Sequence, residues 1–448
     1  MIRQKKASEL GREGCEALLR KPAFDEVELG EKAKARIKES FGEELSAVQV
    51  VQRIVDDVRR RKNEALCDYT RRFDGVQLTA DTLEVTAAEW EEACQEVDEA
   101  LLASIRRAVA NVRRYHSEQL PKSWLTYREH GAMLGQNSRP LDRVGLYVPG
   151  GTATYPSSVI MNAVPAAVAG VREIIMVAPP DRQGRLAPCV LAAAREAGVH
   201  RVFKVGGAQA VAALAFGTET VPKVDKITGP GNIFVTLAKK AVYGHCDIDM
   251  LAGPSEILIL ADDSARADYI AADMLSQAEH DVLASSVLIT DSEKLATAVE
   301  IELERQLALL PRREMAAAAL EKNGLILVTG SIEEAAELAN VAAPEHLEVL
   351  TAQPFALLPQ LRHAGAIFLG PYSPEPLGDY FAGPNHVLPT GGTARFYSVL
   401  NVETFMKKTS LIAYTQEALT AVADDVIRLA EAEGLQAHAN AVKVRRND

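Results

Sequence analysis

The chain has 448 residues, a formal net charge of −12 and 48% hydrophobic residues. This length exceeds what one compact core usually holds, so two or three domains are expected. The acidic balance argues against a nucleic-acid or anionic-membrane surface, where clustered Lys and Arg neutralise phosphates, and the apolar runs are too short to span a bilayer.

The five cysteines are widely spread and form no C-x-x-C pair. A disulfide framework or a cysteine-rich zinc site is therefore not expected. Cys246, in "YGHCDIDM", is the one cysteine near a motif, and a small buried thiol is favoured there over a nucleophile. The first residues are charged without an apolar core behind them, which does not resemble a signal peptide. We expect a cytoplasmic protein.

Residues 1 to about 140 are predicted to be mostly helical. The stretch "ELSAVQVVQRIVDDVRRRKNEALCDYTRRFDG" has apolar residues at helical spacing and ends at a glycine. From residue 143 the pattern changes to short apolar runs that alternate with helical stretches. The first runs are "RVGLYVPGG", "EIIMVAPP", "RVFKVGG" and "DKITGPG".

A second series of such runs follows, namely "EILILAD", "SSVLITD", "GLILVTG" and "AGAIFLG". Alternation of this kind is typical of β-α-β units and a parallel sheet. Two series predict two α/β domains. We expect the ligand to bind between them, where the carboxyl ends of the strands meet. The tail from about residue 401 is predicted to be a helical segment.

Glycine turns follow three of the predicted strands. "GPGNIF", residues 229–234, follows a short strand and opens a helical run, as a phosphate-binding turn does. It lacks the third glycine of a dinucleotide fingerprint, and Asp249, 20 residues on, stands where a ribose-binding acid would. An ordinary strand-to-helix turn remains the alternative. "VGGAQA" (205–210) and "YVPGGT" (147–152) strengthen the case for a ligand of nucleotide size.

The stretch "SQAEHD" ends a predicted helix and carries Gln277 and His280. At i and i+3 on a helix these two side chains share one face and can reach a single metal ion. A polar helix end is the commoner explanation of such a pair, because glutamine is a poor zinc ligand. Stronger ligands must come from elsewhere in the chain.

Later segments contain candidates for such ligands and for acid–base groups. In "APEHLEV", Glu345 and His346 follow a proline, and neighbouring residues of an extended segment point to opposite sides, so the pair is expected to flank a substrate. "EPLGDYFAGPNHVLPTGG" holds Asp379 among glycines and prolines, in the kind of loop that often carries function. "AEAEGLQAHANAV" places Glu433 and His438 beyond a helix that a glycine ends. Each segment alone is more often a solvated loop.

Taken together, these segments closely resemble the histidinol dehydrogenase family, zinc enzymes that complete L-histidine biosynthesis. The resemblance covers roughly residues 30–445. It is carried by "RVGLYVPGGTATYPSSVIMNAVPA", "VGGAQAVAALAFGTETVPKVDKITGPGNIFV", "DMLAGPSEILILAD", "DMLSQAEHD", "APEHLE", "GDYFAGPNHVLPTGGTARF" and "EGLQAHANAV".

The resemblance implies a role for each matching residue. Zinc, one ion per subunit, would be held by Gln277, His280, Asp379 and His438. The substrate L-histidinol would contact Ser255, Gln277, His280, His346, Asp379, Glu433 and His438. The cofactor NAD⁺ would contact Tyr147, Gln209 and Asn232, and Asp249 would not take part. Glu345 and His346 would be the catalytic residues.

The resemblance also implies an architecture and a reaction. The fold would be two incomplete, doubly wound Rossmann-like domains in a homodimer that exchanges its C-terminal segment, with Glu433 and His438 crossing to the partner subunit. The expected boundaries are a helical segment at 1–38, a zinc-binding and catalytic domain of 39–146 plus 255–400, an NAD-binding domain at 147–254, and a dimerisation segment at 401–448. L-histidinol would be oxidised through L-histidinaldehyde to L-histidine with two NAD⁺. His346 would act as base in both oxidations and Glu345 would activate the water between them.

Two other functions remain open at this point. One is a related NAD-dependent dehydrogenase that oxidises another small amino alcohol or diol. The other is a zinc hydrolase, in which Glu345 would activate metal-bound water and no dinucleotide would bind.

Overall fold

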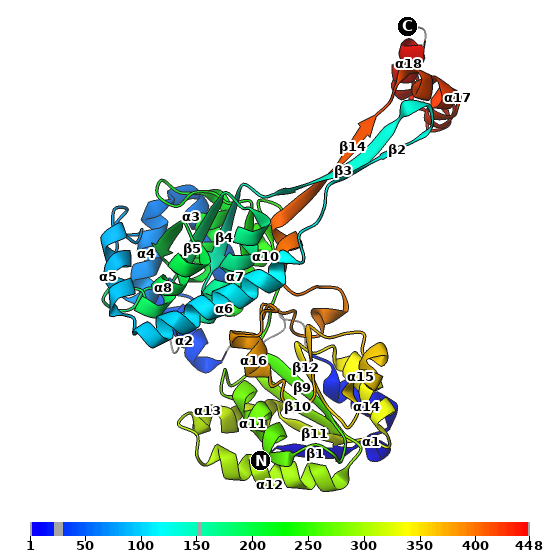
Figure 1. Ribbon diagram of the computed structural model, residues 1–448. Coiled ribbons are helices and arrows are strands. Elements are labelled where there is room, and N and C mark those ends of the chain that lie inside the picture. Colours follow the sequence, from blue (N-terminus) through cyan, green and yellow to red (C-terminus); the bar gives the residue numbers. More distant parts are fainter. Residues whose placement is uncertain (1, 22–29, 151–153, 447–448) are drawn as a thin grey trace.

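Two parallel sheets and an antiparallel arm make up the computed structural model, which describes residues 2–21, 30–150 and 154–446 (Figure 1). We call the first part the six-strand lobe (2–19 and 255–380) and the second the five-strand lobe (31–117 and 143–250). The third part, the arm (124–140 and 406–446), projects away from both lobes (Figure 1). None of the helices in the described ranges is long and apolar enough to cross a membrane.

The six-strand lobe is built on a fully parallel sheet with helices on both faces. Its strands, in spatial order, are β1 (Arg3–Lys6), β11 (Leu325–Val328), β10 (Ser285–Thr290), β9 (Glu256–Ala261), β12 (His346–Leu350) and β13 (Ala366–Leu369). Alternate residues of β9 enter two separate cores, because successive side chains of a strand point to opposite faces. Ile257 and Ile259 pack under one set of helices, and Leu258 and Leu260 under the other.

The helices of this lobe divide between those two cores. On the first face lie α11 (Ala267–Ala278), α12 (Glu293–Leu307) and α13 (Arg313–Asn323). On the second lie α1 (Ala7–Leu19), α14 (Ile332–Ala342) and the short α15 (Pro354–Leu357). The parallel arrangement explains why the strand sequences are continuous apolar runs, since both faces are covered.

The five-strand lobe has the same architecture. Its parallel sheet has the order β6 (Arg201–Lys204), β5 (Glu173–Ala178), β4 (Arg143–Tyr147), β7 (Lys226–Thr228) and β8 (Asp247–Ile248). One face is covered by α5 (Ala87–Glu96), α6 (Glu99–Ser117), α7 (Pro156–Ala169) and α8 (Pro188–Ala197). The other is covered by α2 (Glu31–Phe41), α3 (Ala47–Arg61), α4 (Asn63–Asp74), α9 (Gly207–Phe216) and α10 (Ile233–Val242).

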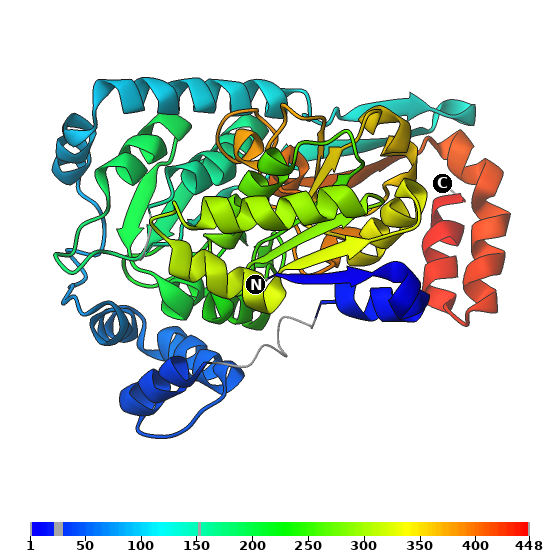
Figure 2. The same ribbon diagram turned by 90° about the horizontal axis from the view of Figure 1, so that it is seen from below.

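The lobe boundaries differ from those expected in two places. Residues 39–146 were expected beside 255–400, but helices α3 to α6 cover the five-stranded sheet instead, and the apolar side of α3 packs on α9 and α10. Residues 1–38 were expected to be a separate helical segment, but β1 is the edge strand of the six-stranded sheet, drawn in dark blue in Figure 2. An amphipathic pattern shows which side of a helix is buried and does not show against what, so neither contact was evident from the sequence.

The arm consists of three antiparallel strands and a terminal helix pair. Strands β2 (Trp124–Tyr127), β3 (Met133–Pro140) and β14 (Met406–Ala413) pair in the order β14-β3-β2, and α17 (Gln416–Ala432) and α18 (Gln436–Arg446) follow. The helices of residues 401–448 were predicted, whereas β14 was not. Its partner β3 lies more than 260 residues earlier in the chain, so their pairing has no local signal.

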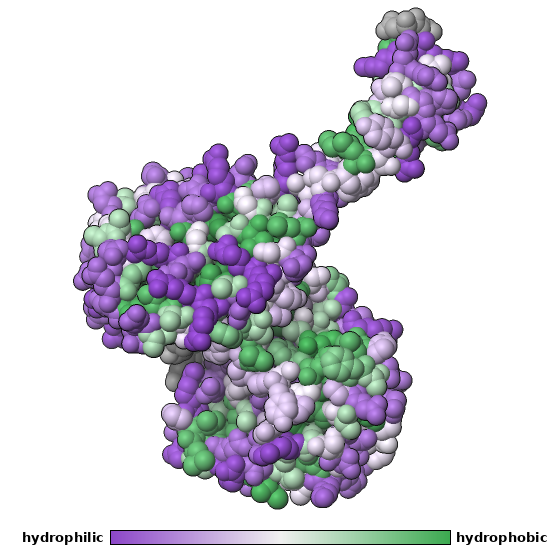
Figure 3. Space-filling view, viewed as in Figure 1, coloured by the Kyte–Doolittle hydropathy of each residue, from purple (hydrophilic) through white to green (hydrophobic). Residues whose placement is uncertain are grey.

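The segment after α16 (Glu375–Tyr380) makes contacts with the five-strand lobe. Asn111 of α6 donates a hydrogen bond to the carbonyl of Phe381 at 3.0 Å, and Asn385 donates one to the carbonyl of Met161 in α7 at 2.6 Å. Val387 then enters the core beneath α6 and α7. These contacts place α16 where the two lobes meet, at the narrow waist of the surface seen in Figure 3.

Candidate active site

The predicted site residues of the six-strand lobe gather at the amino ends of its strands. Ser255 precedes β9, Glu345 precedes β12 and His346 is the first residue of that strand, while Gln277 lies in the last turn of α11. We had expected these residues at the carboxyl ends of the strands, but in this lobe the structure places them at the opposite, amino edge of the sheet. In a parallel α/β sheet the carboxyl ends of the helices lie at the amino ends of the strands, and the negative end of a helix dipole favours a cation.

Three further side chains of this lobe form a group with the spacing of a metal site. Ligand atoms of His280, Glu375 and Asp379 all lie within 4.8 Å of one another. Gln277 lies in the last turn of α11, the chain turns just beyond it to His280, and the Gln277 side chain is completely buried. Neither of its amide atoms has a hydrogen-bond partner within the described ranges. A buried amide without partners is costly, so this environment fits a bound cation.

Glu375 was not among the predicted site residues. It lies four residues before Asp379 on α16, which places both carboxyl groups on one side of the helix. Burial, together with the charge of Asp379, raises the pKa of Glu375 to about 8. A protonated Glu375 can donate a hydrogen bond to Asp379 at neutral pH. The i,i+4 spacing of the two acids was the available sequence signal.

Asp379 remains ionised in these surroundings. Burial alone would raise the pKa of its carboxyl group, but the charges of His386 and His346 hold that pKa well below its usual range. His386 also donates from Nδ1 to the Asp379 carbonyl at 3.0 Å. Desolvation by its surroundings lowers the pKa of His280. An anionic carboxylate and a neutral imidazole are the forms in which these side chains bind a metal.

The two ring nitrogens of His346 have different partners. Nδ1 lies 3.0 Å from the carbonyl oxygen of Glu256, so it carries the hydrogen in the neutral ring. Nε2 is buried without a hydrogen-bond partner among the described residues and lies 3.7 Å from the Asp379 carboxylate. Burial lowers the pKa of His346, but Glu345 and Asp379 raise it more, to about 10. Nε2 is therefore the nitrogen that is available to exchange a proton with a ligand.

We had expected Glu345 and His346 to flank the site from opposite sides. Instead, Glu345 lies against the His346 imidazole. Its Oε2 is 3.6 Å from His346 Nδ1 and accepts a hydrogen bond from the Glu256 backbone at 2.8 Å. Neighbouring side chains point to opposite sides only within a strand, and β12 begins at His346, so Glu345 does not follow this rule. Burial raises the pKa of Glu345 to about 8, which places its proton exchange near neutral pH.

In the five-strand lobe the predicted cofactor residues lie at the carboxyl ends of the strands, as expected. Tyr147 ends β4, and its hydroxyl accepts a hydrogen bond from the Gly207 backbone at 3.0 Å. Gln209, in the first turn of α9, has a buried Oε1 that has no partner within the described part of the chain. Asn232 caps α10 by accepting hydrogen bonds from two backbone amides of its first turn.

The turn at residues 229–231 depends on glycine and on Asp249. Gly229 has φ +111°, and a Cβ atom there would collide with the carbonyl oxygen of Tyr147. The Asp249 carboxylate accepts a hydrogen bond from the Gly229 backbone at 2.8 Å and pairs with Lys239. Asp249 therefore supports the turn from beneath, and this role explains its spacing from the glycines. Residues 151–152 of the predicted "YVPGGT" turn lie outside the described residues.

Glu433 and His438 lie far from this group within one chain. Glu433 ends α17, Gly434 follows with φ +75° as the predicted stop, and His438 is in α18. Both side chains are exposed at the far end of the arm (Figure 1). A single chain therefore does not bring them to Asp379.

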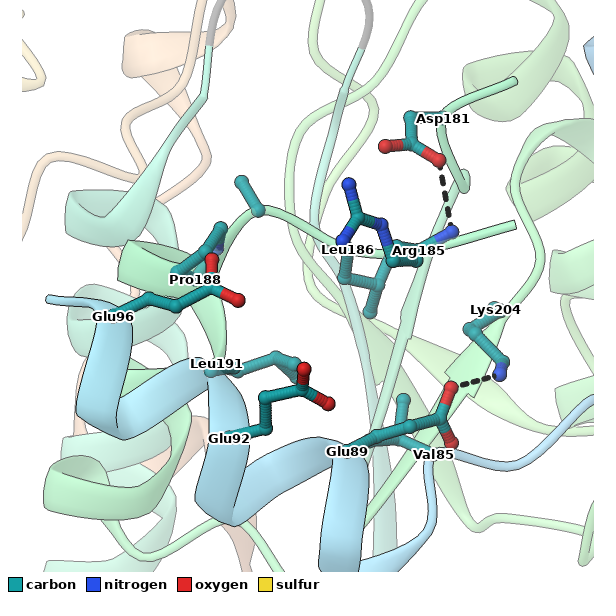
Figure 4. Close-up of a pocket in the computed structure, with 12 residues that line it drawn as sticks. Val85, Glu89, Glu92, Glu96, Asp181, Arg185, Leu186, Pro188, Leu191 and Lys204 are labelled. Atoms are coloured by element: carbon teal, nitrogen blue, oxygen red, sulfur yellow. Dashed lines mark hydrogen bonds and ion pairs between the residues drawn. The ribbon is translucent and has the colours of Figure 1, made fainter. Parts of the chain in front are cut away.

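Two other features do not belong to the predicted site. A surface pocket between α5 and the segment before α8 is lined by Glu92, Glu96 and Arg185, and Lys204 pairs there with Glu89 at 2.6 Å (Figure 4). The predicted site residues are not part of its described lining. Cys246 is buried, and burial raises the pKa of its thiol to about 12, as expected of a structural cysteine.

Comparison with known proteins identifies the family. A family model described as histidinol dehydrogenase matches residues 38–446. The histidinol dehydrogenase of Heliobacterium mobile is 59% identical over 91% of this chain and 95% of its own length, and that of Geobacillus kaustophilus is 59% identical over 88% and 92%. The chain belongs to the histidinol dehydrogenase family.

A solved structure extends this relationship to the fold. The histidinol dehydrogenase of Elizabethkingia anophelis is 34% identical, with a TM-score of 0.90, and the match covers 99% of this chain and 98% of that one. At that coverage the fold shared between the two histidinol dehydrogenases includes the arm as well as both lobes.

Proposed function

We propose that this chain is a zinc-dependent histidinol dehydrogenase that oxidises L-histidinol through L-histidinaldehyde to L-histidine, with two NAD⁺ as oxidants, in the last step of histidine biosynthesis. One observation carries the assignment within the family: the free Nε2 of His346 lies 3.7 Å from Asp379, in a group whose buried Gln277 amide lacks partners among the described residues. A base thus lies beside a site that fits a metal.

Gln277, His280 and Asp379 would hold the zinc ion, with His438 of the partner subunit as the fourth ligand. A bound zinc ion supplies a fixed point for the substrate's imidazole and amino nitrogens, and positive charge that favours the neutral His346 ring. Ser255 lies next to the start of β9 and, with Glu433 of the partner subunit, would contact the substrate.

In the first oxidation His346 Nε2 accepts the hydroxyl proton of L-histidinol while the carbinol hydride passes to NAD⁺. With its pKa of about 10, the His346 ring would hold a proton on Nε2 at neutral pH, and the positive charge of a bound zinc ion would favour its loss. The Glu256 carbonyl keeps the remaining hydrogen on Nδ1, so Nε2 of the neutral ring has its lone pair free for this transfer. The charges of Glu345 and Asp379 stabilise the imidazolium that results.

The aldehyde must then add water before the second oxidation. The ionised form of Glu345 takes a proton from the attacking water, and its pKa of about 8 makes that form a stronger base than an ordinary carboxylate. After the imidazolium of the first oxidation has released its proton to solvent, His346 accepts the hydroxyl proton of the hydrated aldehyde as the second hydride leaves for another NAD⁺.

NAD⁺ would bind at the carboxyl edge of the five-stranded sheet, in contact with Tyr147, Gln209 and Asn232. Helices α9 and α10 both begin at this edge, and the positive ends of their dipoles suit the diphosphate. The two lobes would thus offer opposite helix ends to opposite charges: amino ends to the diphosphate and a carboxyl end to the metal.

The assembly would be a homodimer in which the arm crosses to the partner subunit. Large apolar side chains on the arm are exposed in the single chain, including Tyr127 at 78% and Ile412 at 75%. Exposure of this kind favours a protein partner. We place the enzyme in the cytoplasm, and its five free cysteines fit a reducing compartment.

A stoichiometric assay tests this function. The zinc-loaded protein is mixed with L-histidinol and excess NAD⁺, and NADH is counted by absorbance against histidinol consumed. Two NADH per histidinol are expected, whereas a ratio of one would exclude the second oxidation. A hydrolase would form no NADH, and a dehydrogenase for another amino alcohol would prefer a substrate without the imidazole. Chelation should abolish the reaction and added zinc should restore it.

A further inference from the structure

We propose that Glu348 is a positioning residue, which holds the helix that carries Asp379 at a set distance from His346. This inference rests on the proposed function, because it concerns the metal ligand of that site. Glu348 is completely buried on β12, two residues after His346. Since side chains two residues apart on a strand share a face, Glu348 and His346 both point toward α16.

The contact between Glu348 and α16 is a helix cap supplied by another element. Oε1 of Glu348 accepts a hydrogen bond from the Glu375 backbone amide at 2.7 Å. The residue at the cap position is Pro374, which makes no side-chain cap, so in the described structure this first amide depends on the carboxylate from β12. Asp379 lies one turn further along the same helix.

The length of α16 explains why such an anchor matters. With six residues the helix is far too short to be stable by itself, so its position depends on contacts with the rest of the lobe. Gly378 lets α16 approach β13 closely, because a Cβ there would come within 2.6 Å of the Phe368 ring. That packing sets the separation between helix and strand, while the Glu348 hydrogen bond sets the position along the helix axis.

The other oxygen of Glu348 connects the anchor to a third element. Oε2 has no donor group nearby in the described ranges, and the side chain faces the carboxyl group of Asp273 on α11. Two carboxyl groups form a hydrogen bond only when they share a proton, and burial raises the pKa of both. Asp273 precedes Gln277 by one helical turn, so the pair joins the three elements that carry His346, Asp379 and Gln277.

The chemistry of the pair predicts which substitutions are tolerated. Glu348→Gln keeps the acceptor for the Glu375 amide and offers an N–H to Asp273, so it should retain zinc affinity within about threefold. Glu348→Met fills the same volume without an acceptor. It should weaken zinc affinity by about 10–100-fold, as loss of an outer partner of a metal ligand typically does. The Michaelis constant for L-histidinol should rise with it, while NAD⁺ affinity should not change.

The experiment measures zinc affinity by competition with a chromogenic chelator on the full-length protein, alongside NAD⁺ binding and thermal unfolding. The matched control is Glu334→Met on α14 of the same lobe. Like Glu348, Glu334 accepts a hydrogen bond from a backbone amide, that of Gly330 at 2.7 Å, but this amide precedes α14 and not α16. This control should bind zinc like the wild type.

A second variant separates positioning from folding. The double variant Asp273→Leu/Glu348→Met replaces the buried carboxyl pair by apolar side chains, a change that folded proteins often tolerate. This variant still lacks the acceptor for the Glu375 amide. If this variant folds and binds zinc as tightly as the wild type, Glu348 does not position the metal ligand. A wild-type protein that neither binds zinc nor oxidises histidinol would instead refute the proposed function.

Discussion

At the scale of single residues, the acid–base chemistry depends on how Glu345 and His346 share their surroundings. The backbone of Glu256 binds both: its carbonyl accepts from His346 Nδ1, and its amide donates to Glu345. The backbone of one residue therefore orients the two side chains that we assign to proton transfer. Because Glu345 lies 3.6 Å from the ring, changing it affects both the water-activating group and the charge next to His346.

Glu345→Gln should separate the two halves of the reaction. Glutamine keeps an acceptor for the Glu256 amide, so the fold should be preserved, but it cannot take a proton from water. Oxidation of L-histidinaldehyde should fall by about 10²–10⁴-fold, the usual contribution of a general base, and oxidation of L-histidinol should fall much less. Single-turnover NADH formation from each substrate measures the two halves. Equal losses would remove the assignment of water activation to Glu345.

Asp74, which lies outside the metal site, should make the free energy of unfolding depend on pH. Its Oδ2 is buried without a partner among the described residues, and burial raises the pKa of its carboxyl group to about 6. Because this pKa is higher in the folded than in the unfolded chain, the contribution of Asp74 is fully present below about pH 4 and is lost as the pH rises through 6.

Asp74→Asn removes that titration. At pH 8 the variant should have a free energy of unfolding about 1–2 kcal/mol above that of the wild type, whereas at pH 4 the two should be similar. Urea unfolding of the metal-free proteins at both pH values measures the difference. An equal effect at both pH values would show that the substitution acts through packing and not through the charge.

At the scale of elements, local signals were sufficient for the helices, strands and turns that carry the site. The apolar run of β9 and the Gly229 turn before α10 follow from side-chain burial and backbone geometry within a few residues. The edge of the sheet on which His346 lies could not be predicted in this way. That choice depends on where α11 and α16 end in space, and the latter is set by contacts such as Glu348 with the Glu375 amide.

Asn232 combines two roles that matched substitutions can separate. Its side chain caps α10, and we propose that it also contacts NAD⁺. Asn232→Ala should lower the free energy of unfolding by about 1 kcal/mol and weaken NAD⁺ binding. Asn232→Asp keeps a good cap, so stability should be close to the wild type, but its charge would repel the diphosphate. If Asn232→Asp binds NAD⁺ like the wild type in calorimetry, Asn232 is only a cap.

At the scale of the whole molecule, the arm is the part that a single chain leaves incomplete. The buried side chains of its helices are alanines, Ala418, Ala423, Ala430 and Ala439, whereas Leu429 is 68% exposed. Small residues cannot form a substantial core of their own, so the apolar surface of the arm requires another surface to cover it. Periodicity predicted the helices correctly, but whether an arm packs on its own chain or on a second copy is not a local property of the sequence.

Subunit complementation tests whether the arm completes the site of the partner. His346→Ala should lower turnover by orders of magnitude through loss of the base, and His438→Ala should do the same through loss of a metal ligand. If the arms are exchanged, a hybrid dimer of the two variants contains one site with both histidines intact and one site that lacks both. Random reassociation of equal amounts makes half of the dimers hybrids, so about a quarter of wild-type activity should return. If each arm served its own chain, every site in the mixture would lack one histidine and no activity would return.

The complementation therefore distinguishes exchange of the arms from simple dimerisation, because both assemblies have the same mass but only the exchanged one regains turnover.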